Sequence, residues 1–421
     1  MKRGFYTIMA AQFFSSLADN ALFIAAMAIL TQIHAPSWMN PLLKWSFALS
    51  YVLLAAFVGA FADSRPKGEV MFVTNLIKIT GCSLMFFNVH PVIAYGIVGF
   101  GAAAYSPAKY GILTELLPPE KLVEANGWIE GLTIGSIILG FTLGGQLVSA
   151  KVSSMLMAIH FPIIDFGIDT AAKSALVVIT GCYVIAGIFN LRIPNTGVKY
   201  KEPEYMPIQL AKDFGHCSYA LWKDKLGQVS LSVTTLFWGA GASLQLIVIR
   251  WAEINLNLSL SDGTQLLGVF LVGIAIGAIC AAHFVPLKKS LSVMPLGILM
   301  GLCVASMAFV THYALGCVLL MFIGGLAGYF VVPMNALLQH RGHVLMSAGH
   351  SIAVQNFNEN VSILLIVSMY ALMEYFKINI FFIIISFGLF VAGTMYAVML
   401  KHQANQRVLD SVALIGEEKS H

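Results

Sequence analysis

Long apolar segments recur along the whole chain. A helix needs about 20 residues to cross the hydrocarbon core of a bilayer. Windows of that size fall at 5–33, 43–62, 69–89, 92–117, 122–149, 174–193, 227–253, 264–286, 291–311, 313–338, 347–375 and 379–400. The runs are continuous, whereas the strands of a membrane barrel alternate polar and apolar residues. The pattern therefore predicts an all-α polytopic membrane protein with twelve transmembrane helices.

Ionisable side chains interrupt several of these apolar segments. A charge at the bilayer centre costs at least about 2.5–3.5 kcal/mol, so such residues normally face a bundle interior or a wet cavity and pair with one another. They are Asp19, Lys78, Lys109, Glu115, Glu130, Arg250, Glu253, His283 and Glu359. Their positions predict a polar route through the middle of the molecule.

Composition agrees with a membrane protein. The chain is 58% hydrophobic and 10% charged, against roughly 25% charged in an ordinary soluble domain. If the N-terminus is cytoplasmic, the outer loops hold few basic residues, which predicts two cytoplasmic termini. The six cysteines are scattered and no metal-ligand cluster or nucleotide-binding loop appears, so we expect neither a metal nor a cofactor.

The most polar long segment, 194–225, divides the helices into two groups of six. We expect an N-terminal bundle at 1–193, a cytoplasmic linker at 194–225, a C-terminal bundle at 226–402 and a cytoplasmic tail at 403–421. The end of the linker, Ile208 to Leu221, has the pattern of an amphipathic helix on the membrane surface. Faint similarity between the halves predicts pseudo-symmetric bundles with the substrate site at their interface.

Four motifs carry a resemblance to known proteins. The stretch GAFADSRPKG (Gly59–Gly68) resembles the loop between helices 2 and 3 of the major facilitator superfamily. The stretches SSLADNALF (Ser15–Phe23), SPAKYGILTELLPPEKLVEANGWIEG (Ser106–Gly131) and the polar region Pro333–Asn360 are similar to the bacterial lysophospholipid transporter family within it. The resemblance implies a major facilitator fold in the bacterial inner membrane and a transporter, not an enzyme.

The resemblance also implies a substrate and a mechanism. Members of the family move lysophosphatidylethanolamine and related lysolipids to the cytoplasmic leaflet, where an acyltransferase/acyl-carrier-protein synthetase re-acylates them. We expect that enzyme to be a separate partner, the transporter to be a monomer, and no nucleic acid to take part. By the same resemblance Asp63, Arg65 and Lys67 would form a latch on the cytoplasmic side.

Asp19 and Asn20 lie near the middle of the first predicted helix. An ionised Asp at that depth needs a cation, and the candidates are Lys109 and Arg250. Glu253, three residues after Arg250 on nearly the same helical face, competes for Arg250. Lys109 and Arg250 are also the expected phosphate ligands of the headgroup.

The eleventh predicted helix carries a polar stripe that includes Gln355, Asn356 and Glu359. Such a stripe either joins helices or lines a cavity, and we favour a cavity lined also by Trp128 and Phe357. Glu130 and Glu359 are expected to meet an ammonium group on the substrate. Lys78 is expected to snorkel to the cytoplasmic interface.

Two other functions fit parts of the pattern. A proton-coupled drug exporter of the same superfamily would use Asp19 or Glu359 as its titrating acid. A membrane-embedded acyltransferase would use His160, five residues before Asp165, as its base. We reject the acyltransferase because this motif falls in an outer loop.

Overall fold

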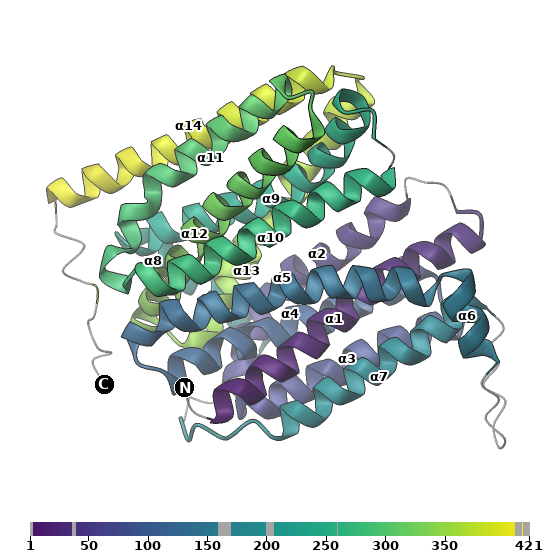
Figure 1. Cartoon of the computed structure of the whole chain (residues 1–421). Helices are drawn as coiled ribbons and strands as arrows, with labels where there is room; N and C mark the ends of the chain where they lie inside the picture. Colours follow the sequence, from purple (N-terminus) through teal and green to yellow (C-terminus); the bar gives the residue numbers. More distant parts are fainter. Residues whose placement is uncertain are drawn as a thin grey trace. The chain divides into compact units, whose positions relative to one another are not determined.

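The computed structural model describes residues 3–35, 39–158, 170–198, 206–258, 260–408 and 415. These residues form helices and connecting turns, with no strand in the described part of the chain (Figure 1). Residues up to 198 form α1 (Arg3–Gln32), α2 (Met39–Asp63), α3 (Lys67–Phe86), α4 (Pro91–Leu116), η1 (Pro119–Lys121), α5 (Leu122–Leu147), α6 (Ala150–Met157) and α7 (Ala171–Leu191).

Later residues form α8 (Pro207–Lys223), α9 (Gly227–Asn255), α10 (Leu260–Phe284), η2 (Leu287–Val293), α11 (Met294–Ser306), η3 (Met307–Phe309), α12 (Tyr313–Leu345), α13 (Ala348–Tyr375) and α14 (Ile380–Val408). The predicted all-α polytopic fold is confirmed. Within the described residues, ten helical segments are long and apolar enough to span a membrane.

Two further helices, α4 and α13, have 26 and 28 residues but are not among those ten. Both fall on predicted spans. α4 carries Lys109 and Glu115, and α13 carries the polar stripe from Gln355 to Asn360. These two helices hold several of the predicted site residues.

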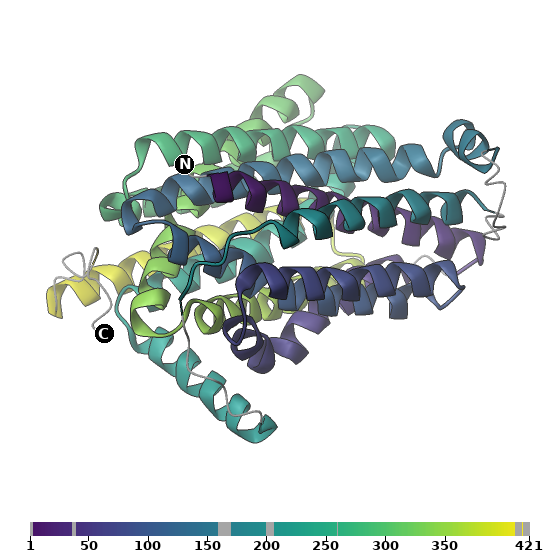
Figure 2. The same ribbon diagram turned by 90° about the horizontal axis from the view of Figure 1, so that it is seen from below.

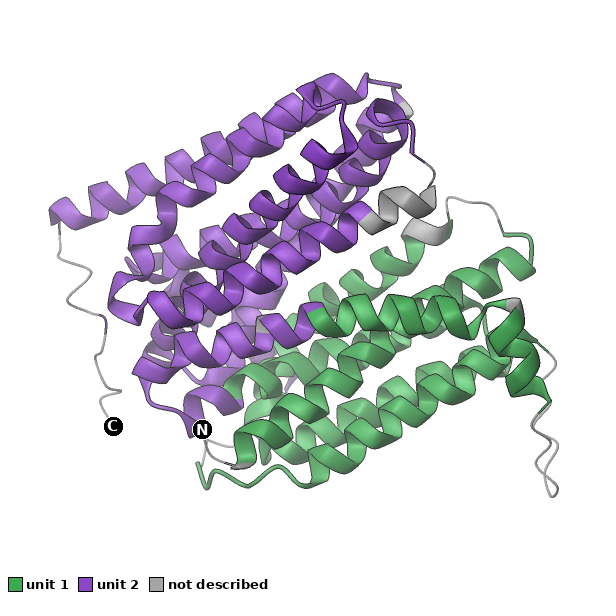
Figure 3. Cartoon of the chain, viewed as in Figure 1, with its two compact units in different colours: residues 1–111, 135–203 green, residues 112–134, 204–421 purple. Residues whose placement is uncertain are grey.

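The chain divides into two compact units (Figure 3). Unit 1 comprises residues 1–111 and 135–203, and unit 2 comprises residues 112–134 and 204–421. This division by contacts groups the end of α4 and the first half of α5 with the later helices. The predicted bundle boundaries at 193 and 226 stay a prediction.

In unit 1, α7 packs along both α1 and α3. The core between them is formed by small and aliphatic side chains, among them Ala18, Leu22, Cys82 and Ile179, and it includes the buried Tyr183. Alanines on α1 allow close packing of helices, as is usual in membrane bundles. This packing brings polar residues of α1, α3 and α7 toward one another.

In unit 2, α10 and α12 are packed very closely. A Cβ atom built on Gly328 would collide with the carbonyl oxygen of Ile274, and one built on Gly277 would collide with that of Gly325. Glycine is therefore required at these two positions because backbone meets backbone.

The predicted amphipathic helix forms as α8 and belongs to unit 2 (Figure 2). Part of its apolar side packs on protein: Phe214, Cys217 and Leu221 contact a core cluster of unit 2 that contains Leu231 and Leu338. Ile208 and Tyr219 on the same helix are exposed, and its place on the membrane surface stays a prediction.

Candidate functional site

A buried ion pair stands at the centre of unit 1. Lys78 Nζ on α3 lies 2.7 Å from Asp19 Oδ2 on α1 and donates a hydrogen bond of 3.0 Å to Ser15 Oγ. The Lys78 side chain is 2% exposed and that of Asp19 is 18% exposed. Ser15 and Asp19 are four residues apart, so one face of α1 presents both groups to the ammonium.

Aromatic residues surround this pair. Tyr183 on α7 donates a hydrogen bond of 2.7 Å from its hydroxyl to Asp19 Oδ1. The ring of Tyr105 on α4 lies with its centroid 4.9 Å from Lys78 Nζ, a cation–π contact. Asn75 on α3 donates to the backbone oxygen of Tyr183 at 2.6 Å. Four helices therefore fix the two charges, which satisfies the rule that a buried charge needs a partner and hydrogen bonds.

A polar pocket of about 140 Å³ opens beside the ion pair within unit 1. It is lined by Gln12, Ser15, Ser16, Asp19, Tyr51, Lys78, Ala102, Tyr105, Ser106 and Lys109. The lining contains two lysines and one aspartate, a formal excess of one positive charge. The pocket thus has the polarity and the charge to receive a small anionic group.

The structure contradicts the prediction for Lys78 and places Lys109 in the same pocket as Asp19. Lys78 does not snorkel to an interface: it lies in mid-helix and pairs with Asp19, a partner 59 residues away in sequence. The predicted cations for Asp19 were Lys109 and Arg250, and Lys78 takes that place. Lys109 does line the same pocket as Asp19, with its Nζ 4.1 Å from the ring centroid of Tyr110.

Asn20 is half-buried and bonds along its own helix, from Nδ2 to the backbone oxygen of Ser16 at 2.8 Å. It does not line the pocket. Glu130 lies on α5, and its side chain is outside the described part of the structure. His160 and Asp165 also lie outside the described residues. The described residues contain no group of His, Cys, Asp and Glu that would hold a metal ion.

A second polar cluster lies in unit 2, between α12 and α13. Gln355 Nε2 donates to Asn335 Oδ1 at 3.1 Å and to Glu359 Oε1 at 2.7 Å, and all three residues are buried. Asn356 is buried on the same helix. Phe357 packs edge-on against Phe214 of α8, with ring centroids 5.5 Å apart, and Trp128 is exposed. A cavity that both residues line stays a prediction.

Arg250 on α9 takes the alternative partner that helical spacing indicated. Its Nη1 donates to Glu253 Oε2 at 2.7 Å, and its Nε lies 3.9 Å from Glu374 Oε2 on α13. The Arg250 side chain is 43% exposed. The guanidinium therefore keeps accessible surface that another anion can approach.

The predicted latch residues occupy the turn between α2 and α3. Lys67 Nζ lies 2.5 Å from Asp63 Oδ1 and donates to the backbone oxygen of Ala62 at 2.8 Å. Both side chains are buried, whereas Arg65 is exposed. The acid and one base thus stabilise the turn, and their conformational role stays a prediction.

Sequence reasoning missed a second buried ion pair, in unit 2. Arg341 on α12 donates to Asp224 through Nε at 3.2 Å and Nη2 at 2.7 Å. Asp224 Oδ1 also accepts from the backbone of Gly227 at 2.7 Å, at the start of α9. Arg341 lies beyond the predicted span at 313–338, on the part of α12 that continues to Leu345. An Asp just before a helix is a capping signal. It indicates the role of Asp224 at the start of α9 and does not indicate the pairing with Arg341.

Sequence reasoning also missed a neutral pair. Asn126 on α5 and Gln339 on α12 exchange two hydrogen bonds, of 2.8 and 2.9 Å. Both residues are buried and both belong to unit 2. The side-chain amides satisfy each other, as buried polar groups require.

Asn126→Ala should lower stability because it leaves the Gln339 amide buried without these bonds, at a cost of about 1–3 kcal/mol. Replacing both residues with leucine should restore part of the loss. Thermal unfolding of purified single and double variants measures this coupling. Asn358→Ala is the matched control, because the Asn358 amide bonds only to Val354 of its own helix. A single variant as stable as the wild type would contradict the assignment.

These features define a polytopic membrane transporter: apolar helices that keep charged residues and a polar pocket in their interior. A sequence profile described as Major Facilitator Superfamily matches residues 8–367. The chain is 39% identical over 372 residues to "Lysophospholipid transporter LplT" of Yersinia enterocolitica serotype O:8 / biotype 1B, covering 88% of this chain and 87% of that protein. It is 40% identical over 373 residues to the Serratia proteamaculans protein of the same name, covering 88% and 89%.

Solved structures agree on the fold. The transporter FucP in the outward conformation aligns with a TM-score of 0.71 at 13% identity, covering 95% of this chain and 98% of that one. A bacterial homologue of the iron transporter ferroportin aligns with a TM-score of 0.70 at 14% identity, covering 96% and 100%. The chain belongs to the major facilitator superfamily, in the group of the LplT lysophospholipid transporters.

Proposed function

We propose that this protein moves lysophosphatidylethanolamine and related lysolipids from the outer to the inner leaflet of the bacterial inner membrane. Transport proceeds by alternating access of two bundles, with both termini cytoplasmic. A separate acyltransferase/acyl-carrier-protein synthetase then re-acylates the lipid. The similarity to LplT proteins over 88% of the chain supports the substrate class.

The observation that carries the proposal is the positively charged pocket of unit 1. A lysophospholipid has a phosphate that needs a cation and hydrogen-bond donors away from water. Lys109 supplies a point charge there, and Arg250, on α9 of unit 2, supplies a fork that suits a phosphate. Asp19, Glu130 and Glu359 offset charge on the substrate or the protein, and Gln355 and Asn356 provide polar groups on α13. Asp63, Arg65 and Lys67 serve as the cytoplasmic latch.

The acyl chain sets the opposite requirement. Burial in an apolar environment is worth about 0.8 kcal/mol per CH₂ group, so a 16-carbon chain contributes on the order of 10 kcal/mol. Moving the chain through a water-filled pore would cost this free energy, so we exclude such a path for the chain. The headgroup therefore crosses the membrane in contact with polar residues, while the tail stays in lipid or in an apolar groove.

The test is a flip assay with labelled lysophosphatidylethanolamine in vesicles that contain only this protein. Lys109→Gln should slow transport about tenfold or more, because a hydrogen bond to a charged group is worth about 1.5–3 kcal/mol. Lys109→Arg keeps the charge and should retain most of the rate. The matched control is Lys401→Gln, which changes an exposed lysine and should have no effect.

Vesicles without flip activity would contradict the proposal. The runner-up, a proton-coupled exporter, predicts a different pattern: substrate movement that stops when the proton gradient is collapsed. Lysolipid movement that persists after that collapse supports a facilitated flippase and excludes the exporter.

A further inference from the structure

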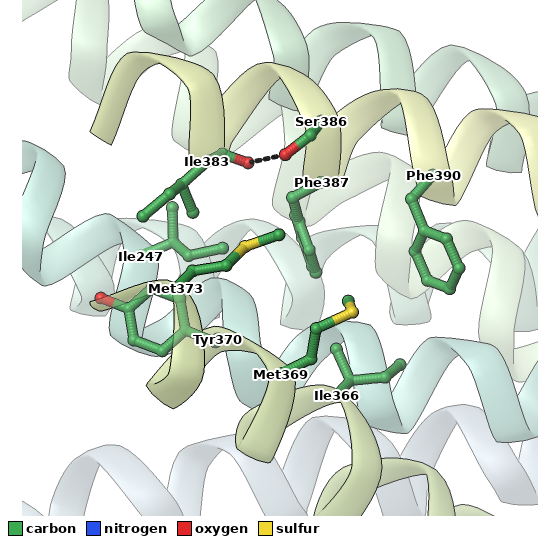
Figure 4. Close-up of a pocket in the computed structure, with 9 residues that line it drawn as sticks. All are labelled: Ile247, Ile366, Met369, Tyr370, Met373, Ile383, Ser386, Phe387 and Phe390. Atoms are coloured by element: carbon green, nitrogen blue, oxygen red, sulfur yellow. Dashed lines mark hydrogen bonds between the residues drawn. The ribbon is translucent and has the colours of Figure 1, made fainter. Parts of the chain in front are cut away.

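Unit 2 contains an apolar groove of about 210 Å³ between α9, α13 and α14 (Figure 4). The polar groups on its wall are occupied: Ser386 Oγ donates to the backbone oxygen of Ile383 at 3.1 Å, and the hydroxyl of Tyr370 donates to Glu374 at 3.2 Å. The groove therefore offers an occupant mainly hydrocarbon contacts. These come from Ile247, Ile366, Met369, Met373, Phe387 and Phe390.

The size and the lining suit one narrow, flexible chain. Pockets for drug-sized ligands have about 300–1,000 Å³, and this groove is smaller. Met369 and Met373 line it from successive turns of α13, and methionine adapts to irregular apolar shapes. The groove is too small for a whole long acyl chain and has room for a segment of one chain.

A cation lies next to one part of the groove. Arg250 follows Ile247 by three residues on α9 and therefore shares its helical face. Its Nε is 3.9 Å from Glu374, the residue after Met373 and one turn after Tyr370. The guanidinium thus sits beside the wall formed by Tyr370 and Met373. Its side chain is 43% exposed beside Glu253, and a phosphate binds a guanidinium in a bidentate manner.

We infer that this groove holds a segment of the single acyl chain of a lysophospholipid while Arg250 receives its phosphate. The inference rests on the proposed function and deepens it by giving the tail a place within unit 2. Arg250 and the narrow groove are complementary to one lipid class, in which a headgroup with a phosphate is joined to one chain. Free fatty acid lacks the phosphate, and a diacyl lipid brings a second chain for which the groove has no room.

The experiment uses the full-length protein in lipid nanodiscs and lysophosphatidylethanolamine with a photoreactive diazirine near the chain end. Cross-linked peptides are mapped by mass spectrometry. We expect adducts on the groove faces of α13 and α14, competed by unlabelled lysolipid and poorly by diacyl phosphatidylethanolamine. Met369→Trp fills the groove and should weaken lysolipid binding about tenfold, the effect of losing about two buried CH₂ groups.

The matched control is Leu365→Trp, on the same helix at an exposed position outside the groove, which should bind lysolipid like the wild type. Because the cross-link map needs only the wild-type protein, the inference is tested even if Met369→Trp does not fold. Adducts elsewhere, in a protein that flips lysolipid in vesicles, would overturn the groove and leave the proposed function intact. Equal competition by diacyl lipid would also overturn it. Absence of any lysolipid flipping would defeat the proposed function and the groove with it.

Discussion

Replacing Lys78 with methionine is expected to destabilise the protein by about 3–5 kcal/mol and to abolish transport. Removing one member of a buried ion pair leaves the other charge without compensation, which is the reason for this large cost. Here the carboxylate of Asp19 would keep the Tyr183 hydroxyl and lose the ammonium 2.7 Å away. Thermal unfolding in detergent and lysolipid uptake in vesicles measure the two effects.

A second variant separates stability from function. The double change Lys78→Met with Asp19→Asn removes both charges and should recover much of the stability, since no ion then remains buried alone. Transport should stay low if the charges serve the substrate. Lys121→Met is the matched control, because Lys121 pairs with Glu124 at the surface and such pairs contribute little. Normal stability and uptake in Lys78→Met would remove the ion pair from the site.

The second large effect is expected from Gly328→Ala, which adds one methyl group between α10 and α12. That methyl would collide with the backbone oxygen of Ile274, and a backbone has no rotamer with which to move aside. Overpacking of a core costs about 1–3 kcal/mol or more. We expect a lower melting temperature and a lower yield of folded protein, measured by scanning fluorimetry and size-exclusion chromatography.

Gly325 gives a control on the same helix. An added methyl there would approach only the backbone oxygen of Gly273, at 3.9 Å, an ordinary contact. Since alanine favours a helix over glycine by about 1 kcal/mol, Gly325→Ala should be neutral or stabilising. If both alanine variants behave alike, close backbone packing of α10 on α12 is not what the glycine at 328 provides.

Much of the fold could be predicted because it depends on local pattern. Apolar runs of the required length identify every long helix, and the turn after α2 was evident from Pro66 and its flanking charges. The helical spacing of Arg250 and Glu253 likewise gave their pair as one of two alternatives, and the structure contains this pair. Each of these features involves residues close in sequence.

The charged centre of unit 1 could be predicted only in part. Polar residues within apolar helices indicated that Asp19 needs a cation, but the choice of Lys78 depends on which faces of α1 and α3 meet. Those residues are 59 positions apart, Arg341 and Asp224 are 117 apart, and Asn126 and Gln339 are 213 apart. Helix periodicity indicates the face of the helix on which each residue lies. It does not indicate which residue of another helix that face contacts.

The link between Asn126 and Gln339 consists of two uncharged groups. A transmembrane voltage does work of about 2.3 kcal/mol per elementary charge per 100 mV on charges that cross it, and it has no net charge to act on here. Salt screens ions and leaves such amides nearly unaffected. The free energy needed to separate α5 from α12 at this point should therefore be the same in a cell with a membrane voltage as in a vesicle without one.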